Sequence, residues 1–377
     1  MNIAVNTRLL IENKLDGIGW FSYESLKRIT QNHPEHRFYF IFDRPFSEEF
    51  IFSDNIEPLV VSPPARHPFL WYYWFEVALP KALKKTKADI FLSPDGYLSL
   101  KTDVKSLPVI HDINFAHNPK DLPLLTRAYY NSFFPEFAKK AMRIATVSEY
   151  SKNDISKTYH IDKSLIDVVY NGANSIYTPL DKIERKQVKQ IYTGGTDYFI
   201  FIGSIHPRKN VVQMLLAFDE FRKNYAKPYK LLIIGSYFFK NQELKSVHQK
   251  MRFREDVVFM GHQAPEKIHR LLAAARALIL VSKFEGFGIP VLEAMYCNVP
   301  AIVSNVTSLP EVGGDAVLYA NPFSVSSISK AMLLMASDDI LRKKLIEKAK
   351  LQRHKFSWDK TAEKLWNSLI KVYETGI

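Results

Sequence analysis

Short apolar runs recur along the chain, and most are followed by a loop and then by a longer stretch of mixed apolar and polar residues. Each run has the length of a buried strand. We expect strands at 3–5, 38–42, 58–61, 89–92, 107–110, 143–148, 168–172, 198–203, 230–235, 257–262, 277–281 and 317–319, and helices at 20–26, 211–223 and 358–373. Because strands alternate with helices, the pattern predicts an α/β protein with parallel sheets covered on both faces.

The strands fall into two series, separated by a polar and mixed segment at 174–196. A length of 377 residues also suggests about two domains. We therefore expect two Rossmann-like domains that face each other across a cleft, residues 1–178 and 179–357. The boundary is expected near Thr178-Pro179, and the crevice between the domains is the default ligand site.

A glycine-containing turn follows the strand expected at 277–281 and leads into a helix. Gly286 and Gly288 would let the backbone approach a ligand closely, and Pro290 suits the first position of a helix. The free N–H groups of such a helix start can hold an anion such as a phosphate.

Two glutamates flank this turn, Glu285 on the loop and Glu293 in the first turn of the helix. Carboxylates accept hydrogen bonds well from pairs of hydroxyls, such as those of a ribose or a hexose. The alternative is an ordinary strand-loop-helix turn with two solvated glutamates. The placement of both around a Gly-x-Gly-x-Pro turn favours a ligand.

Two cations, Arg208 and Lys209, lie on the loop between the strand that ends at Gly203 and the helix expected at 211–223. Arginine offers a planar fork to phosphate oxygens and lysine a point charge, so the pair suits a diphosphate. A solvated basic turn is the alternative.

Two candidates lie in the first series of strands. Gly17 and Gly19 precede a helix and could bring N–H groups against a phosphate or a sugar oxygen. His111 comes directly after the strand expected at 107–110. Ligands collect beyond the carboxyl ends of parallel strands, so this histidine is expected to face a ligand.

Residues 66–87 combine an aromatic cluster with a basic segment that contains Lys81, Lys84, Lys85 and Lys87. Three interpretations stay open. The segment is a core helix with a solvated lysine face, an acceptor-binding helix, or a helix at a membrane surface, where aromatic residues lie at the interface and lysines meet anionic head groups.

The formal charge is +12, from 51 lysines and arginines against 39 acidic residues. This excess favours anionic partners such as nucleic acid, phosphorylated substrates or an anionic membrane. The basic residues are scattered rather than gathered into a nucleic-acid module, so no nucleic-acid partner is expected. Cys297 is the one cysteine, and its apolar neighbours favour a buried structural thiol.

No signal peptide is expected at the N-terminus, and no apolar run approaches the ~20 residues of a spanning helix. With a single cysteine and no internal disulfide, these features predict a cytoplasmic protein. Peripheral association with the inner face of the membrane also fits.

The stretch from Phe284 to Met295 resembles the signature of the family-four retaining glycosyltransferases, which have the GT-B architecture of two facing Rossmann-like domains. Segments 300–305 and 308–311 and the Pro-Arg-Lys-Asn loop at 207–210 are similar to the family as well. The resemblance implies that Glu285 contacts the donor sugar and Glu293 the ribose of the nucleotide. It implies further donor contacts from Gly17, Gly19, Gly203, Gly286, Phe287, Gly288 and Ile289.

The resemblance also implies a catalytic set. His111 would touch the donor sugar or support the reacting centre, and Arg208 and Lys209 would hold the diphosphate. Many members carry an arginine directly after the glycine at 203, where this chain has Ser204. No Asp-x-Asp pair stands at a strand end, so no metal is expected, and the departing phosphate would take the acceptor's proton. In GT-B enzymes a last helix, here in 358–377, returns to the first domain.

These features predict a retaining, metal-independent hexosyltransferase that uses a nucleotide diphosphate sugar. GDP-mannose is favoured, because the Pro-Arg-Lys-Asn loop with His-Asp resembles mannosyltransferases, and UDP-linked hexoses stay open. The expected acceptor is a saccharide or lipid-linked saccharide in cell-surface polysaccharide synthesis, including lipopolysaccharide. Two alternatives are a nucleotide-sugar epimerase or hydrolase of the same fold, and a non-catalytic protein that binds an anionic ligand.

Overall fold

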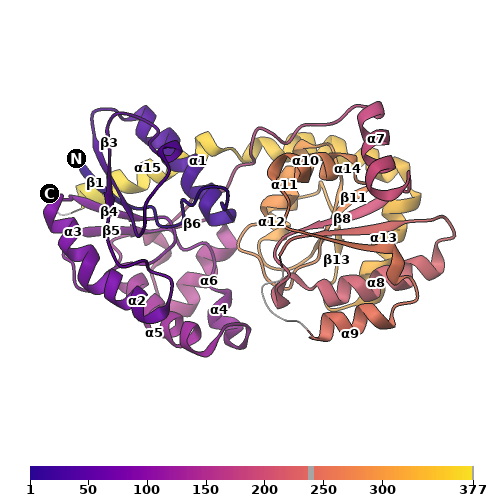
Figure 1. Ribbon diagram of the computed structural model, residues 1–377, viewed down its shortest axis with the longest axis horizontal. Coiled ribbons are helices and arrows are strands. Elements are labelled where there is room, and N and C mark those ends of the chain that lie inside the picture. Colours follow the sequence, from indigo (N-terminus) through magenta and orange to yellow (C-terminus); the bar gives the residue numbers. More distant parts are fainter. Residues whose placement is uncertain (237–241, 376–377) are drawn as a thin grey trace. The chain divides into compact units, whose positions relative to one another are not determined.

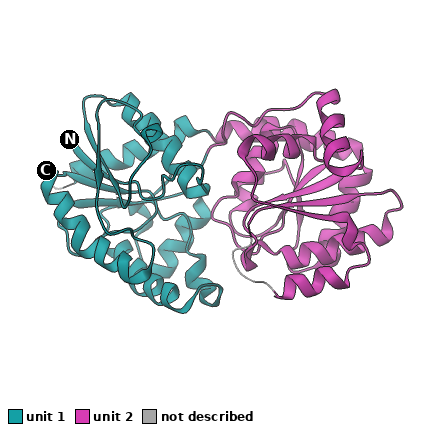
Figure 2. Cartoon of the chain, viewed as in Figure 1, with its two compact units in different colours: residues 1–171, 357–377 teal, residues 172–356 magenta. Residues whose placement is uncertain are grey.

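Parallel strands form the centre of each of two units, which are coloured separately in Figure 2. The structure is a computed structural model and describes residues 1–236 and 242–375. Unit 1 comprises residues 1–171 and 357–377, and unit 2 comprises residues 172–356. The division precedes the expected Thr178-Pro179 boundary because Tyr177 is buried within unit 2 and His269 Nε2 donates to the Thr178 carbonyl there at 2.8 Å.

Unit 1 contains a five-stranded parallel sheet with the order β3-β2-β1-β4-β5. Its strands are β1 (Asn2–Asn6), β2 (Arg37–Phe42), β3 (Ile56–Val60), β4 (Ile90–Ser93) and β5 (Lys105–Pro108). Val5 of β1 lies between Phe40 of β2 and Leu92 of β4. The strand order therefore changes direction between β1 and β4. The strands β6 (Ile144–Thr146) and β7 (Ile166–Val168) form a separate parallel pair.

The helices of unit 1 surround this sheet (Figure 1). They are α1 (Gly17–Asn32), α2 (Pro68–Tyr73), α3 (Leu79–Lys85), α4 (Asn114–His117), α5 (Leu124–Lys140), α6 (Glu149–Tyr159) and α15 (Trp358–Glu374), with 3₁₀ turns at Glu48–Phe50, Pro119–Asp121 and Lys163–Leu165. The C-terminal helix α15 packs on α1, where Trp358 contacts the Phe21 ring and Asp359 pairs with Arg28 at 2.6 Å. The last two residues of the expected 358–377 segment lie outside the described residues.

Helices α2 and α3 are joined through a π-helical turn at Trp74–Ala78, so one continuous helical segment covers residues 68–85. Trp74, Phe75 and Leu79 are fully buried in the core of unit 1. The aromatic residues of α2 and the lysines of α3 are largely exposed. Of the three interpretations of residues 66–87, a core helix is therefore correct only for the buried face that carries Trp74, Phe75 and Leu79.

Unit 2 contains a six-stranded parallel sheet with the order β10-β9-β8-β11-β12-β13. Its strands are β8 (Tyr198–Ile202), β9 (Lys230–Ile234), β10 (Val257–Gly261), β11 (Ala277–Leu280), β12 (Ala301–Ser304) and β13 (Leu318–Ala320). The β12 strand is not among those expected from the apolar runs. The first strand of the unit, β8, lies between β9 and β11, so the order reverses between β8 and β11.

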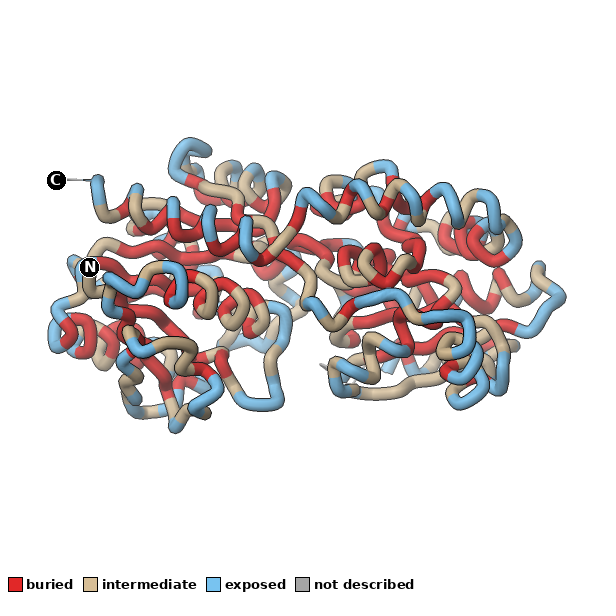
Figure 3. The backbone as a smooth tube through the Cα atoms, turned by 90° about the horizontal axis from the view of Figure 1, so that it is seen from above, coloured by how far each residue is buried: buried red, intermediate tan, exposed pale blue. Residues whose placement is uncertain are grey.

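Helices also surround the sheet of unit 2, and the burial pattern in Figure 3 places its buried residues mainly along the strands and inner helix faces. The helices are α7 (Lys182–Thr193), α8 (Val211–Asn224), α9 (Gln242–Lys250), α10 (Pro265–Ala274), α11 (Ile289–Tyr296), α12 (Leu309–Gly313), α13 (Val325–Ser337) and α14 (Asp339–Gln352), with 3₁₀ turns at Pro207–Lys209, Arg254–Asp256 and Arg353–Lys355. Cys297 is fully buried, and burial raises the pKa of its thiol. This confirms the expected structural thiol. In the described part of the chain, no helix combines the length and apolar character needed to cross a bilayer.

Candidate functional site

The strongest cluster of expected site residues lies where the strand order of unit 2 reverses. The loop after β8 carries Arg208 and Lys209, and the loop after the neighbouring strand β11 carries Glu285. In an open parallel sheet, the two loops at such a reversal separate and leave a ligand site beyond the carboxyl ends of the strands. The fold therefore brings these three residues to the place where a doubly wound sheet binds its ligand.

Glu285 is held by two cations at once. The Lys209 ammonium lies 2.6 Å from Glu285 Oε1, and Arg208 Nη1 lies 3.0 Å from Glu285 Oε2. The Ser282 hydroxyl donates to Oε1 at 2.7 Å. Glu285 is buried, with 4% of its surface exposed. Burial alone would raise the pKa of its carboxyl, but the charges of Lys209 and Arg208 outweigh burial and lower the pKa to about 2.

Hydrogen bonds connect the two loops. The Lys283 N–H donates to the Arg208 carbonyl at 2.8 Å, and Arg208 Nη1 donates to the Phe284 carbonyl at 3.0 Å. The Asn210 side chain donates to the Val281 carbonyl at 3.0 Å. Because Asn210 is buried, these bonds form where water competes little, and they fix the loops as one rigid frame.

The expected turn at Gly286–Gly288 is present and leads into α11, which begins at Ile289. Gly288 caps the helix with a φ of 101°, and a Cβ built there would lie 2.6 Å from Leu309 Cδ2. Only glycine fits this position without strain. Gly286 and Phe287 are buried, and the Phe287 ring packs edge-on against Phe356 at 5.5 Å.

Glu293 is the fifth residue of α11, so the prediction that it lies in the first turn is wrong by about one position. Its carboxylate is half-buried and forms a hydrogen bond with the hydroxyl of Tyr177. Burial raises the pKa of Glu293 to about 7, while the hydrogen bond with Tyr177 acts in the opposite direction. Tyr177 has no counterpart among the expected site residues. Tyr177 lies near the start of the polar segment 174–196, and nothing in the sequence around it indicated a contact with Glu293.

Gly203 directly follows β8 in the same candidate site. Its N–H donates to the Ile234 carbonyl at 3.0 Å. A Cβ built on Gly203 would lie 3.8 Å from Lys209 Cε, so the lysine stem passes close to this glycine. The structure therefore places Gly203 beside Lys209.

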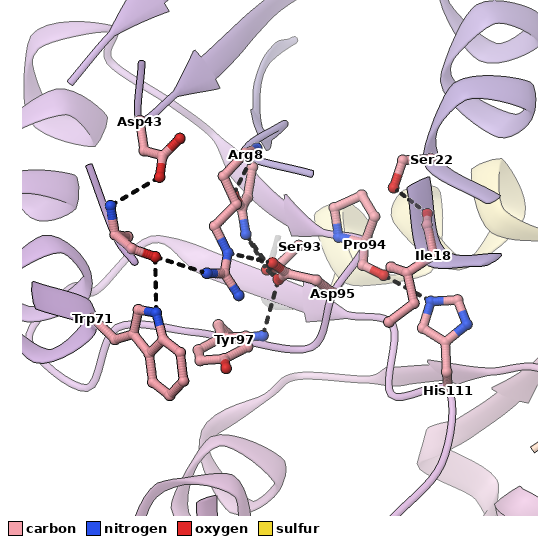
Figure 4. Close-up of polar contacts among 12 residues, drawn as sticks. Arg8, Ile18, Ser22, Asp43, Trp71, Ser93, Pro94, Asp95, Tyr97 and His111 are labelled. Atoms are coloured by element: carbon pink, nitrogen blue, oxygen red, sulfur yellow. Dashed lines mark hydrogen bonds and ion pairs between the residues drawn. The ribbon is translucent and has the colours of Figure 1, made fainter. Parts of the chain in front are cut away.

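His111 lies in unit 1, in the loop after β5 (Figure 4). Its Nε2 lies 2.8 Å from the Pro94 carbonyl, and its ring packs edge-on against Phe21 at 4.9 Å. A carbonyl only accepts, so Nε2 carries the proton and Nδ1 is the acceptor in the neutral ring. Burial lowers the pKa of His111, which favours that neutral form.

Gly17 and Gly19 lie in the first turn of α1, which begins three residues before the expected helix at 20–26, and they differ in what they offer. The Gly19 N–H donates to the Asp16 carboxylate at 2.9 Å, so this donor is already used as a helix cap. Gly17 is exposed. The expectation that both glycines present an N–H group to a ligand is therefore corrected for Gly19.

An ion pair that local sequence does not predict lies beside His111. Arg8 follows β1 and Asp95 follows β4, and their side chains meet at 2.6 Å where the strand order of unit 1 reverses (Figure 4). The Arg8 guanidinium also lies 4.2 Å from the centre of the Tyr97 ring. Each residue lies two positions beyond the end of a buried strand, so the same attention to strand ends that selected His111 would have reached both residues.

No cluster of three or more His, Cys, Asp or Glu side chains suited to a metal ion occurs within residues 1–236 and 242–375. Metal independence stays a prediction. The structure thus brings Arg208, Lys209, Glu285, Gly203 and the start of α11 together in unit 2. His111, Gly17 and Gly19 belong to unit 1.

Two family models cover most of the chain. The model described as "Glycosyl transferases group 1" matches residues 182–352, and "Glycosyltransferase Family 4" matches residues 16–175. The O-antigen chain mannosyltransferase B of Escherichia coli is 32% identical over 279 residues, which is 74% of this chain and 73% of that protein. The O-antigen chain mannosyltransferase RfbU of Salmonella typhimurium is 27% identical over 266 residues, 70% of each chain.

Among solved structures, sucrose-phosphate synthase from Thermosynechococcus elongatus has a TM-score of 0.78 at 12% identity and covers all of both chains. At this identity the likeness concerns the fold alone. It agrees with two Rossmann-like units, so the expected α/β, GT-B fold class is confirmed.

Proposed function

The chain belongs to the group 1 glycosyl transferases, and we propose that it moves a mannose from GDP-mannose to a saccharide or lipid-linked saccharide with retention of anomeric configuration. The proposed process is the synthesis of a cell-surface polysaccharide such as the O-antigen part of lipopolysaccharide. Mannose is supported by the names of the two relatives above, which are O-antigen mannosyltransferases. The reaction is proposed to take place on the cytoplasmic side.

The observation that carries this proposal is the cluster of Lys209, Arg208 and Glu285 at the strand reversal of unit 2. Two cations share one carboxylate, so the cluster keeps one positive charge in excess. The diphosphate of a nucleotide sugar is an anion that this excess charge attracts. The start of α11 at Ile289 adds N–H groups that favour negative charge, with Gly288 allowing close approach.

The proposed mechanism follows from where charge develops. As the bond between sugar and phosphate breaks, negative charge grows on the departing diphosphate, and Lys209 and Arg208 stabilise it. Glu285 lies next to both cations and is proposed to accept hydrogen bonds from the sugar hydroxyls. Glu293 is proposed to accept from the ribose hydroxyls. His111 is proposed to contact the donor sugar or support the reacting centre, and the departing phosphate takes the proton of the acceptor hydroxyl.

The proposal needs no metal, because the positive charge at the diphosphate comes from side chains. A thermal-shift screen with GDP, UDP, ADP and their sugars tests the donor, since a ligand that binds only the native state raises the melting temperature. We expect GDP and GDP-mannose to give the largest shifts, with no further gain from Mg²⁺ or Mn²⁺. A larger shift with UDP-linked sugars would contradict the choice of base.

Product analysis separates transfer from an epimerase or hydrolase of the same fold. Without acceptor, a transferase consumes GDP-mannose slowly, and addition of a saccharide acceptor accelerates donor consumption. Rapid consumption without acceptor would favour the epimerase or hydrolase.

A further inference from the structure

The exposed large hydrophobic side chains of the described residues are concentrated on one helix of unit 1. Phe69, Leu70, Tyr72 and Tyr73 all lie on the six-residue helix α2, and Phe69 is 71% exposed. Elsewhere such side chains stand singly or in pairs, for example Ile340 and Leu351 at opposite ends of α14. Single exposed apolar residues are ordinary, whereas a contiguous group marks a contact surface.

A neighbouring helix carries further exposed apolar residues. Helices α2 and α5 lie side by side (Figure 1), and the Tyr72 ring packs against Phe133 of α5 at 5.9 Å. Leu124 and Leu125, at the start of α5, are 68% and 47% exposed. We call the exposed apolar residues of α2 with Leu124 and Leu125 the α2–α5 surface.

Positive charge borders the α2–α5 surface. Arg66 precedes α2, while Lys81, Lys84 and Lys85 are exposed on α3 of the same continuous helical segment, and Lys87 follows it. The ammonium of Lys101 lies 5.8 Å from the centre of the Tyr72 ring. Between Ser62 and Ala88 the only acidic residue is Glu76, which is buried and accepts a hydrogen bond from the Leu100 N–H.

We propose that the α2–α5 surface docks on an anionic phospholipid bilayer. Aromatic side chains on the outer side of a helix enter the boundary between head groups and acyl chains, while flanking lysines pair with anionic head groups. The excess of lysines over acidic residues along residues 66–87 favours an anionic lipid surface over a protein partner, whose contact area would normally carry both signs of charge. Membrane docking does not require a bound donor. It rests on the proposed function in one respect, because docking would bring the protein close to a lipid-linked acceptor.

Sedimentation with lipid vesicles tests this proposal, using phosphatidylcholine vesicles with and without phosphatidylglycerol. We expect the wild-type protein to sediment with vesicles that contain phosphatidylglycerol, and to be released as salt is raised. The Lys84→Glu/Lys85→Glu variant should bind at least about 25-fold more weakly, from about fivefold per lysine lost. The Phe69→Ser/Tyr73→Ser variant should bind at least about tenfold more weakly.

Helix α14 of unit 2 supplies matched controls. Lys343→Glu/Lys344→Glu reverses two neighbouring exposed lysines, and Ile340→Ser/Leu351→Ser removes two exposed apolar side chains. Both control variants should bind vesicles like the wild type. Every variant should keep the wild-type melting temperature and its shift with GDP, which separates a failure of docking from a failure of donor binding.

Three results would overturn the proposal. The first is no binding of the wild type to phosphatidylglycerol vesicles, and the second is equal binding by the α2–α5 variants and their α14 controls. The third is a wild-type dimer in solution that Phe69→Ser/Tyr73→Ser dissociates, because a second copy of the chain would then cover the surface.

Discussion

The Lys209 ammonium and the Glu285 carboxylate form a buried ion pair of 2.6 Å between the loops that follow β8 and β11. The pair joins the cation proposed to hold the diphosphate to the carboxylate proposed to hold the sugar. A substitution of either residue therefore leaves the other without its closest opposite charge. The effects of such a substitution on stability and on turnover must be measured separately.

We predict that Lys209→Met destabilises the protein by about 3 kcal/mol, because it leaves Glu285 buried with only Arg208 to balance its charge. Adding Glu285→Gln should restore most of that loss, since the carboxylate charge is then gone. Chemical denaturation of the wild type, the single variant and the double variant measures both effects. Equal free energies of unfolding for the single variant and the wild type would mean that the pair contributes nothing to stability.

Nucleotide binding should weaken at acidic pH because of Glu293. Its pKa is raised to about 7 from an ordinary value of 4.5, so the carboxylate is ionised above neutral pH and protonated below it. An ionised carboxylate accepts hydrogen bonds from both ribose hydroxyls, so we expect affinity for GDP to fall by about tenfold for each pH unit below the pKa. Calorimetric titration at pH 6, 7 and 8 measures this, and Glu293→Gln should bind weakly at all three.

Tyr177→Phe should shift the pH dependence of GDP binding to higher pH. The hydrogen bond with Tyr177 lowers the pKa of Glu293, and its loss would let burial raise the pKa further. The midpoint of GDP affinity should then lie at a higher pH than in the wild type. An unchanged midpoint would show that Tyr177 does not control the protonation of Glu293.

Gly288→Ala should damage donor binding through the backbone. Alanine is strained at a φ of 101°, and its Cβ would press on Leu309. Gly194→Ala is a matched control, since Gly194 also has a positive φ of 62° and caps a helix, but a Cβ there meets nothing within 4 Å. We expect a larger loss of melting temperature for Gly288→Ala, and a lost GDP shift for that variant alone.

The sequence predicted what depends on local pattern. Apolar runs located nearly every strand of both sheets, and the glycine turn at 286–288 with the flanking Glu285 and Glu293 indicated the candidate site of unit 2. Each of these features lies within a few residues of sequence, so spacing alone is informative. The β12 strand was missed because Ala301–Ser304 is a short run with a polar end.

The sequence did not predict partners that lie far apart in the chain. Arg8 and Asp95 meet only because β1 and β4 are neighbours in the sheet, and Tyr177 meets Glu293 only after the polar segment folds back on unit 2. The ion pair between Lys209 and Glu285 was also unexpected, although both residues were identified as site residues. Strand order and the path of the polar segment create these contacts, and neither is encoded in local spacing.

The most direct test of the proposed transfer site uses the Lys209→Met/Glu285→Gln variant, which the stability argument predicts to be folded. Transfer of labelled mannose from GDP-mannose to a lipid-linked saccharide is measured for this variant and for the wild type. We predict transfer by the wild type and none by the variant, with similar melting temperatures for the two proteins. Wild-type turnover in the variant would contradict the account.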